Sequence, residues 1–125
     1  MAIELRFSNR NSRVDIVCTG LLSSKEARSM PDKAFAPETL PKLKKVVVDY
    51  LCVEHFGLAL QDLEYMAKKT VVAAEKRKGI VIAIIATRLL AIRLTRMWQA
   101  FARNADVEIE IFDSCENAET WLALR

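Results

Sequence analysis

The chain has 125 residues, of which 52% are hydrophobic and 28% are charged. A chain of this length and composition folds around an apolar core, which excludes a disordered tail, a collagen-like repeat and a small disulfide-stapled protein. We expect one domain spanning residues 1–125. The formal net charge of +3 is too small to indicate a protein that binds nucleic acid.

Cys18, Cys52 and Cys115 lie far apart and form no Cys-x-x-Cys motif, so neither a zinc ribbon nor a thioredoxin motif is present. Free thiols are typical of a reducing cytosol. The first seven residues carry charges where a signal peptide has an apolar run. The longest apolar stretch, residues 80–86, is shorter than the ~20 residues that span a bilayer. These features indicate a cytoplasmic protein without stable membrane insertion.

Alternating apolar and polar residues predict two strands, at 3–7 and 14–18, joined by a turn at 9–12. Ser23, with Glu26 three places on, indicates a helix start, and Pro31 is expected to interrupt that helix. The β-branched run 46–48 predicts a strand covered on both faces. We assign no type to the connecting segment 51–56.

Helical spacing over 58–77 precedes a buried strand at 80–86. Thr87 is expected to cap a helix that ends near Arg103, and an alternating strand at 107–111 is expected at a sheet edge. Asp113 or Ser114 then caps a last helix. The order β-β-α-β-α-β-α-β-α predicts an α/β fold: a mixed, largely parallel sheet, opened by a β-hairpin, with helices packed on it.

The helix over 87–103 carries the sharpest pattern. One side is expected to be core and the other holds most of its arginines, with Leu89 at the border. Ile92 among arginines fits a protein partner, an anionic headgroup or a second copy, or else a solvated face with one stray apolar residue. The expected core side comprises Leu90, Leu94, Met97, Trp98 and Phe101, and the opposite side Arg88, Ile92, Arg96, Gln99 and Arg103.

Charge is distributed unevenly along the chain. No acid lies between Glu75 and Asp106, whereas residues 106–119 hold six acids and no base. We expect the basic and acidic runs to pair with each other in the fold.

Residues suited to catalysis are scarce. The turn after Ile85 has no glycine, so a dinucleotide site is excluded, and there is no Walker loop. His55 is the only histidine, which excludes a histidine-rich metal site. Asp49, at the end of a buried strand, either faces a ligand or caps the following turn. With no nucleophile, base and orienting group in evidence, we expect no enzyme activity, no catalytic residue, no metal and no cofactor.

Four segments together resemble the SpoIIAA-like family of bacterial STAS-type domains, which is related in name to Sec14-like domains. Residues 14–23 look like its second strand and first helix start, 46–50 like its strand ending in aspartate, and 80–85 like its central strand. Residues 111–114 with 118–122 are similar to its closing segment. The resemblance covers nearly the whole chain and implies the family's fold.

The family's phosphorylated serine has no counterpart here. Antagonists of anti-sigma factors carry an Asp-Ser-x-Gly type motif at the start of the helix after the aspartate strand. The corresponding segment, residues 54–59, has Gly57 but no hydroxyl group, and the next hydroxyl is Thr70. The serine phosphoswitch therefore does not carry over.

The helix starts near Gly57 and Thr87 are expected at the same end of the sheet, where they form a shallow binding site. This site and the neighbouring helix face comprise His55, Phe56, Gly57, Arg88, Leu89, Ile92 and Arg96. The first hypothesis is a non-catalytic regulatory module that binds a protein partner or a second copy as a homodimer. The alternative is a carrier or sensor of a small apolar or amphiphilic, lipid-like ligand.

Overall fold

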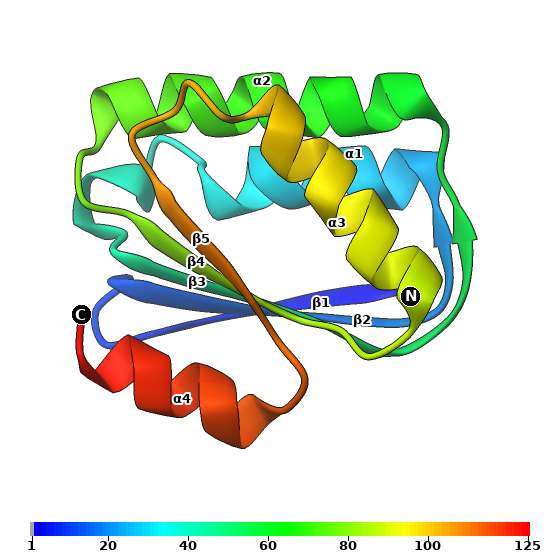
Figure 1. Cartoon of the computed structure of the whole chain (residues 1–125). Coiled ribbons are helices and arrows are strands. Elements are labelled where there is room, and N and C mark those ends of the chain that lie inside the picture. The colour runs from blue at the N-terminus through cyan, green and yellow to red at the C-terminus, as the bar shows by residue number, and fades with distance from the viewer. Residues whose placement is uncertain (1) are drawn as a thin grey trace.

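The computed structural model describes residues 2–125 as a mixed α/β fold (Figure 1). The elements follow the predicted order, with one short 3-10 helix added before the third strand. They are β1 (Ile3–Ser8), β2 (Arg13–Ser23), α1 (Ser24–Ala34), η1 (Leu40–Lys42), β3 (Lys45–Gly57), α2 (Leu60–Lys76), β4 (Val81–Ile85), α3 (Leu89–Phe101), β5 (Glu108–Phe112) and α4 (Cys115–Ala123).

The five strands form one sheet in the order β1-β2-β3-β4-β5. β1 and β2 are antiparallel, and every other neighbouring pair is parallel. The predicted mixed sheet opened by a hairpin is therefore confirmed, as is the edge position of β5. Figure 1 shows α1, α2 and α3 on one face of the sheet and α4 on the other.

β4 lies at the centre of the packing, and all five of its residues are buried. Successive side chains of a strand point to opposite faces, so β4 contributes to two cores. Ile82 and Ile84 belong to the larger core, on the side of α1, α2 and α3. Val81, Ala83 and Ile85 form the smaller core with residues of α4.

β3 is longer than its sequence pattern indicates. Residues 51–56, left without a type, continue the strand and pair with the end of β2 through two register shifts. β4 ends at Ile85, which pairs with Asp49. The part of β3 after Asp49 therefore has no β4 neighbour. Arg88 Nη1 donates to the carbonyls of Val53 (2.7 Å) and Glu54 (2.9 Å). The guanidinium thus satisfies carbonyl groups along this free edge.

Two predicted helix boundaries change, and a third is decided between its two predicted alternatives. α1 continues through Pro31 to Ala34. The proline removes one hydrogen bond of the helix, but the buried residues of α1 hold the helix in place despite this loss. Arg88, rather than Thr87, is the N-cap residue of α3, without a side-chain cap. The α4 cap is Ser114, whose Oγ accepts from the N–H of Asn117 at 3.1 Å.

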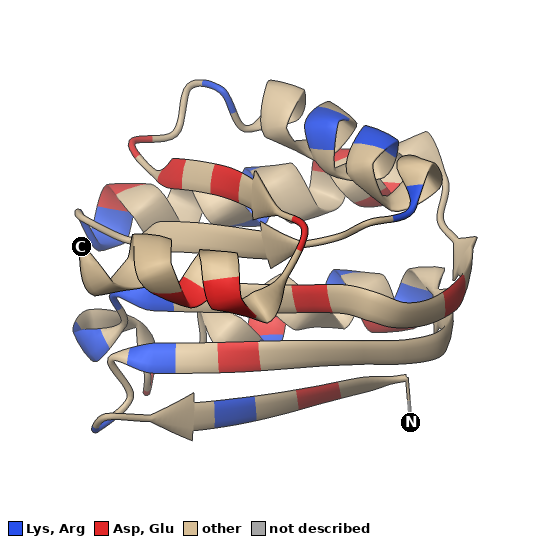
Figure 2. Ribbon diagram, turned by 60° about the horizontal axis from the view of Figure 1, so that its bottom comes forward, with Lys and Arg blue, Asp and Glu red and all other residues tan. Residues whose placement is uncertain are grey.

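The expected pairing of the basic and acidic runs is wrong. Within residues 2–125, the ion pairs of the acidic run join Glu119 to Arg13 and Glu108 to Arg125. None of the six ion pairs uses a base from residues 76–103. Figure 2 shows basic residues, in blue, along α3.

Candidate functional site: an apolar cavity under three helices

α3 lies against α2 and buries its small residues. Ala91, Thr95 and Ala102 are buried, and Thr95 satisfies its hydroxyl by donating to the carbonyl of Ala91 at 2.8 Å. Small side chains allow the two helices to approach each other closely. The expected core side is therefore only partly correct: Leu94 and Trp98 are half-buried, whereas Leu90, Met97 and Phe101 are exposed.

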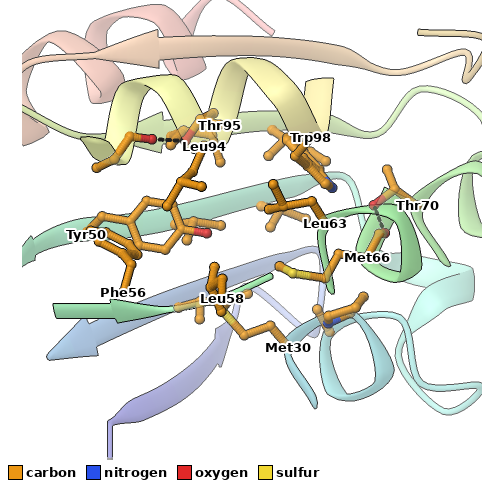
Figure 3. Close-up of a pocket in the computed structure, with 18 of the residues that line it drawn as sticks. Met30, Tyr50, Phe56, Leu58, Leu63, Met66, Thr70, Leu94, Thr95 and Trp98 are labelled. Atoms are coloured by element: carbon orange, nitrogen blue, oxygen red, sulfur yellow. Dashed lines mark hydrogen bonds between the residues drawn. The ribbon is translucent and has the colours of Figure 1, made fainter. Parts of the chain in front are cut away.

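An apolar cavity of about 60 Å³ lies between these helices and the sheet, partly open to solvent (Figure 3). Side chains from α1, α2 and α3 line it on the helix side, and β2, β3 and β4 form its opposite wall. Almost all of them are aliphatic, aromatic or methionine side chains. The lining residues include Met30, Tyr50, Phe56, Met66, Ala91 and Trp98.

The Tyr50 hydroxyl points into this cavity (Figure 3). Its ring packs edge-on against Phe56, with ring centroids 5.7 Å apart. Burial raises the pKa of the phenol, which therefore stays protonated and can donate a hydrogen bond. The other hydroxyls at the wall, Thr70 and Thr95, already donate to backbone carbonyls of their own helices. Tyr50 is therefore the hydroxyl that a molecule in the cavity would meet.

The residues expected to form a shallow site are only partly brought together. Phe56 lines the cavity, and Gly57 ends β3 just before the lining residue Leu58. His55 and Leu89 are exposed, and neither lines the cavity. The other three residues belong to the start and first turns of α3. Arg88 binds the β3 carbonyls, and Ile92 is half-buried. Arg96 donates a hydrogen bond to Gln99 Oε1 at 3.3 Å.

A buried carboxylate fixes the position of α2 beside α1. Asp62 accepts hydrogen bonds from the N–H of Ala59 (2.8 Å), from Ser24 Oγ (2.6 Å) and from Arg28 Nε (2.6 Å). These donors lower its pKa, the backbone N–H of Ala59 most strongly. The cavity wall formed by α1 and α2 is therefore held by a fully bonded ionic group.

A second, polar hollow of about 180 Å³ lies on the opposite face of the sheet, beside α4. Arg13 crosses it and binds both Asp15 and Glu119. Asp49 also lines it, and its Oδ1 accepts from the N–H of Leu51 at 2.9 Å. Asp49 therefore caps no helix or turn, because β3 continues to Gly57 and the bonded N–H belongs to the same strand.

Two of the three thiols have raised pKa values, and the described thiols and acids form no metal-binding group. Cys18 is buried, and burial raises its pKa to about 12, so it remains a thiol. Burial also raises the pKa of Cys115, whose side chain lies beside the acids of the polar hollow. Within residues 2–125, no three His, Cys, Asp or Glu side chains are grouped so that they could hold a metal ion.

Comparison with known proteins defines the class of fold. No protein-family model matches the chain, and no curated protein sequence does so. Two solved structures are similar over almost their whole length. An uncharacterised DUF3478-family protein with a SpoIIAA-like fold from Shewanella loihica PV-4 is 20% identical, with a TM-score of 0.59, over 97% of this chain and 92% of that one.

The second structure is the anti-sigma factor antagonist SpoIIAA in its unphosphorylated form. It is 10% identical, with a TM-score of 0.63, over 98% of each chain. The protein therefore has the SpoIIAA-like, STAS-type fold that its sequence segments resemble. At these identities the similarity concerns the fold.

Proposed function

We propose that this domain is a non-catalytic module that binds a small, largely apolar molecule carrying one polar group. The supporting observation is the cavity under α1, α2 and α3, with its apolar walls and the Tyr50 hydroxyl directed inward. Ligand sites of this kind combine hydrophobic walls with a few polar groups that fix orientation. Of the two functions considered from sequence, this cavity favours the carrier or sensor of a small amphiphilic ligand.

The size of the cavity limits the ligand. About 60 Å³ is less than half the roughly 150 Å³ of an apolar cavity that admits benzene. However, the cavity is partly open, and Met30 and Met66 line it. Methionine side chains are unbranched and adapt readily to a new neighbour. We therefore expect a short aliphatic chain or a single small ring to enter by displacing these side chains.

A series of n-alkanols from butanol to octanol tests the cavity by titration calorimetry. Each added methylene should contribute about 0.8 kcal/mol until the cavity is filled, after which the affinity should level off. Ala91→Val narrows the cavity and should abolish binding, whereas Ala100→Val, on the exposed side of the same helix, should leave it unchanged. Equal affinities of the two variants would refute a site in this cavity.

Tyr50→Phe tests the polar end of the site. Loss of the hydroxyl should weaken alkanol binding by about tenfold, the value of one hydrogen bond, while benzene affinity stays constant. Tyr65→Phe is the matched control, because that hydroxyl contacts Asp32 outside the cavity. An unchanged alkanol affinity in Tyr50→Phe would show that the phenol does not contact the ligand.

A second proposal, supported by the fold alone, is regulation through protein contacts. The similar protein SpoIIAA is an anti-sigma factor antagonist, which acts on another protein. The segment before α2 lacks a hydroxyl residue, so such regulation proceeds here without a serine phosphoswitch. Sedimentation of the purified chain tests the simplest partner, a second copy. A homodimer is expected, and a strict monomer at all concentrations would contradict self-association.

A further inference from the structure

α3 exposes an unusual amount of apolar surface for a helix of 13 residues. The described residues include nine exposed large hydrophobic side chains, and four of these lie on α3. Leu89 is 61% exposed, Leu90 54%, Met97 40% and Phe101 42%. Scattered exposed apolar residues need no explanation, but a concentration on one short element marks an interaction surface.

Arginines lie beside these apolar residues on the exposed surface of the helix. Leu89, Arg93, Arg96 and Met97 share the face opposite Ala91 and Thr95. Leu90 and Phe101 lie at the edge of this face, next to Met97. Arg93 and Arg96 are exposed and take part in no ion pair within residues 2–125. α3 itself contains no acid. The face is therefore cationic and apolar at once.

The exposed apolar side chains of α3 lie outside both hollows described above. Leu89, Leu90, Met97 and Phe101 line neither the apolar cavity nor the polar hollow. Protein partners are typically anchored by side chains that fill well-packed pockets. A second copy would also bring arginines against arginines if two α3 faces met. A face with exposed apolar side chains and adjacent guanidiniums that are not in ion pairs fits an interface that is fluid and anionic.

We propose that α3 docks on the surface of an anionic lipid bilayer. Leu90, Met97 and Phe101 enter the boundary between headgroups and acyl chains, and Arg93 and Arg96 bind lipid phosphates. Docking is peripheral, since none of the helices within residues 2–125 is long and apolar enough to cross a membrane. This inference goes beyond the ligand cavity and does not depend on it, because none of the docking residues lines the cavity.

Co-flotation with vesicles tests the docking face. The chain should bind phosphatidylcholine vesicles that contain phosphatidylglycerol, and should not bind vesicles of phosphatidylcholine alone. Removing two arginines in Arg93→Gln/Arg96→Gln should weaken binding by about tenfold to thirtyfold. The matched control is Arg6→Gln/Arg10→Gln, which removes the same charge from the β1–β2 hairpin and should change binding little. Equal losses in both double variants would show general charge attraction and overturn the proposal.

The apolar contribution is tested separately by Met97→Gln/Phe101→Gln. Both side chains are substantially exposed, so this variant should keep the thermal stability of the parent while losing at least about tenfold in vesicle binding. Undiminished binding would overturn insertion of these residues. If the parent protein does not bind the anionic vesicles even at low salt, the proposal is overturned. If, in addition, Met97→Gln/Phe101→Gln loses self-association, the face is a contact between copies and the proposal is likewise overturned.

The two sites can be distinguished with one set of variants in the calorimetric and flotation assays. Ala91→Val should lose alkanol binding but keep vesicle binding, whereas Arg93→Gln/Arg96→Gln should do the opposite. Failure of the cavity experiment therefore leaves the docking experiment interpretable.

Discussion

Asp62 illustrates how a single residue connects two helices that lie far apart in sequence. Its carboxylate is 3% exposed, yet it accepts three hydrogen bonds, two of them from α1. The sequence pattern identified the Ser23–Glu26 helix start, where the partners are three residues apart, and the structure confirms it. The hydrogen bonds of Asp62 could not be predicted, because its partners Ser24 and Arg28 lie 38 and 34 residues away in sequence. Contacts of that range leave no local pattern.

Asp62→Asn should reveal the stability that this charge contributes. The pKa of Asp62 is lowered below its usual 3.8 in the folded protein. Its contribution is therefore fully present above about pH 4 and is lost as the pH falls through the folded pKa. At neutral pH the variant should be less stable by about 1–3 kcal/mol in urea unfolding, and this difference should shrink in acid.

The control for this residue is Asp32→Asn. Asp32 is a half-exposed carboxylate that contacts Lys69 at 3.5 Å and the Tyr65 hydroxyl at the surface. Surface pairs contribute little, so its loss should cost less than about 1 kcal/mol at any pH. Equal stability losses in the two variants at neutral pH would contradict the buried role of Asp62.

Among the elements, α3 shows most clearly where sequence analysis succeeds and where it fails. Its existence and approximate length were predictable from hydrophobic spacing. Its rotation was not, because the residues that decide it, Ala91, Thr95 and Ala102, are too small or too polar to register as a core stripe. A hydrophobic stripe is recognised by its large side chains, whereas the close contact of α3 with α2 uses small ones.

α4 is the helix that covers the smaller core, and its anchoring can be measured. Leu122 is 1% exposed and packs with Ala118 against β3 and β4. Leu122→Ala should cost about 3–5 kcal/mol in urea unfolding, from lost burial and the cavity left behind. Leu124→Ala, two residues later and 79% exposed, should be nearly neutral. A small effect in Leu122→Ala would contradict tight packing of α4 on the sheet.

For the molecule as a whole, the sequence contained more information about the fold than about the site. Strand alternation, the buried run around Ile82 and the helix spacings were enough to predict the order and class of the fold. The cavity is a space left between side chains from six elements. These side chains come together only in the folded chain, so no sequence pattern marks the cavity. Tyr50 lies beside a recognised strand end, but its inward hydroxyl becomes evident only when α2 and α3 are in place.

The central claim is that the space under α1, α2 and α3 receives an apolar molecule. Nuclear magnetic resonance of the isotopically labelled chain during titration with 1-hexanol tests it most directly. We expect saturable shifts at Met30, Met66, Leu94 and the Trp98 indole N–H, with little change at Trp121 on the opposite face of the sheet. Shifts scattered over the surface, or equal at the two tryptophans, would contradict the account.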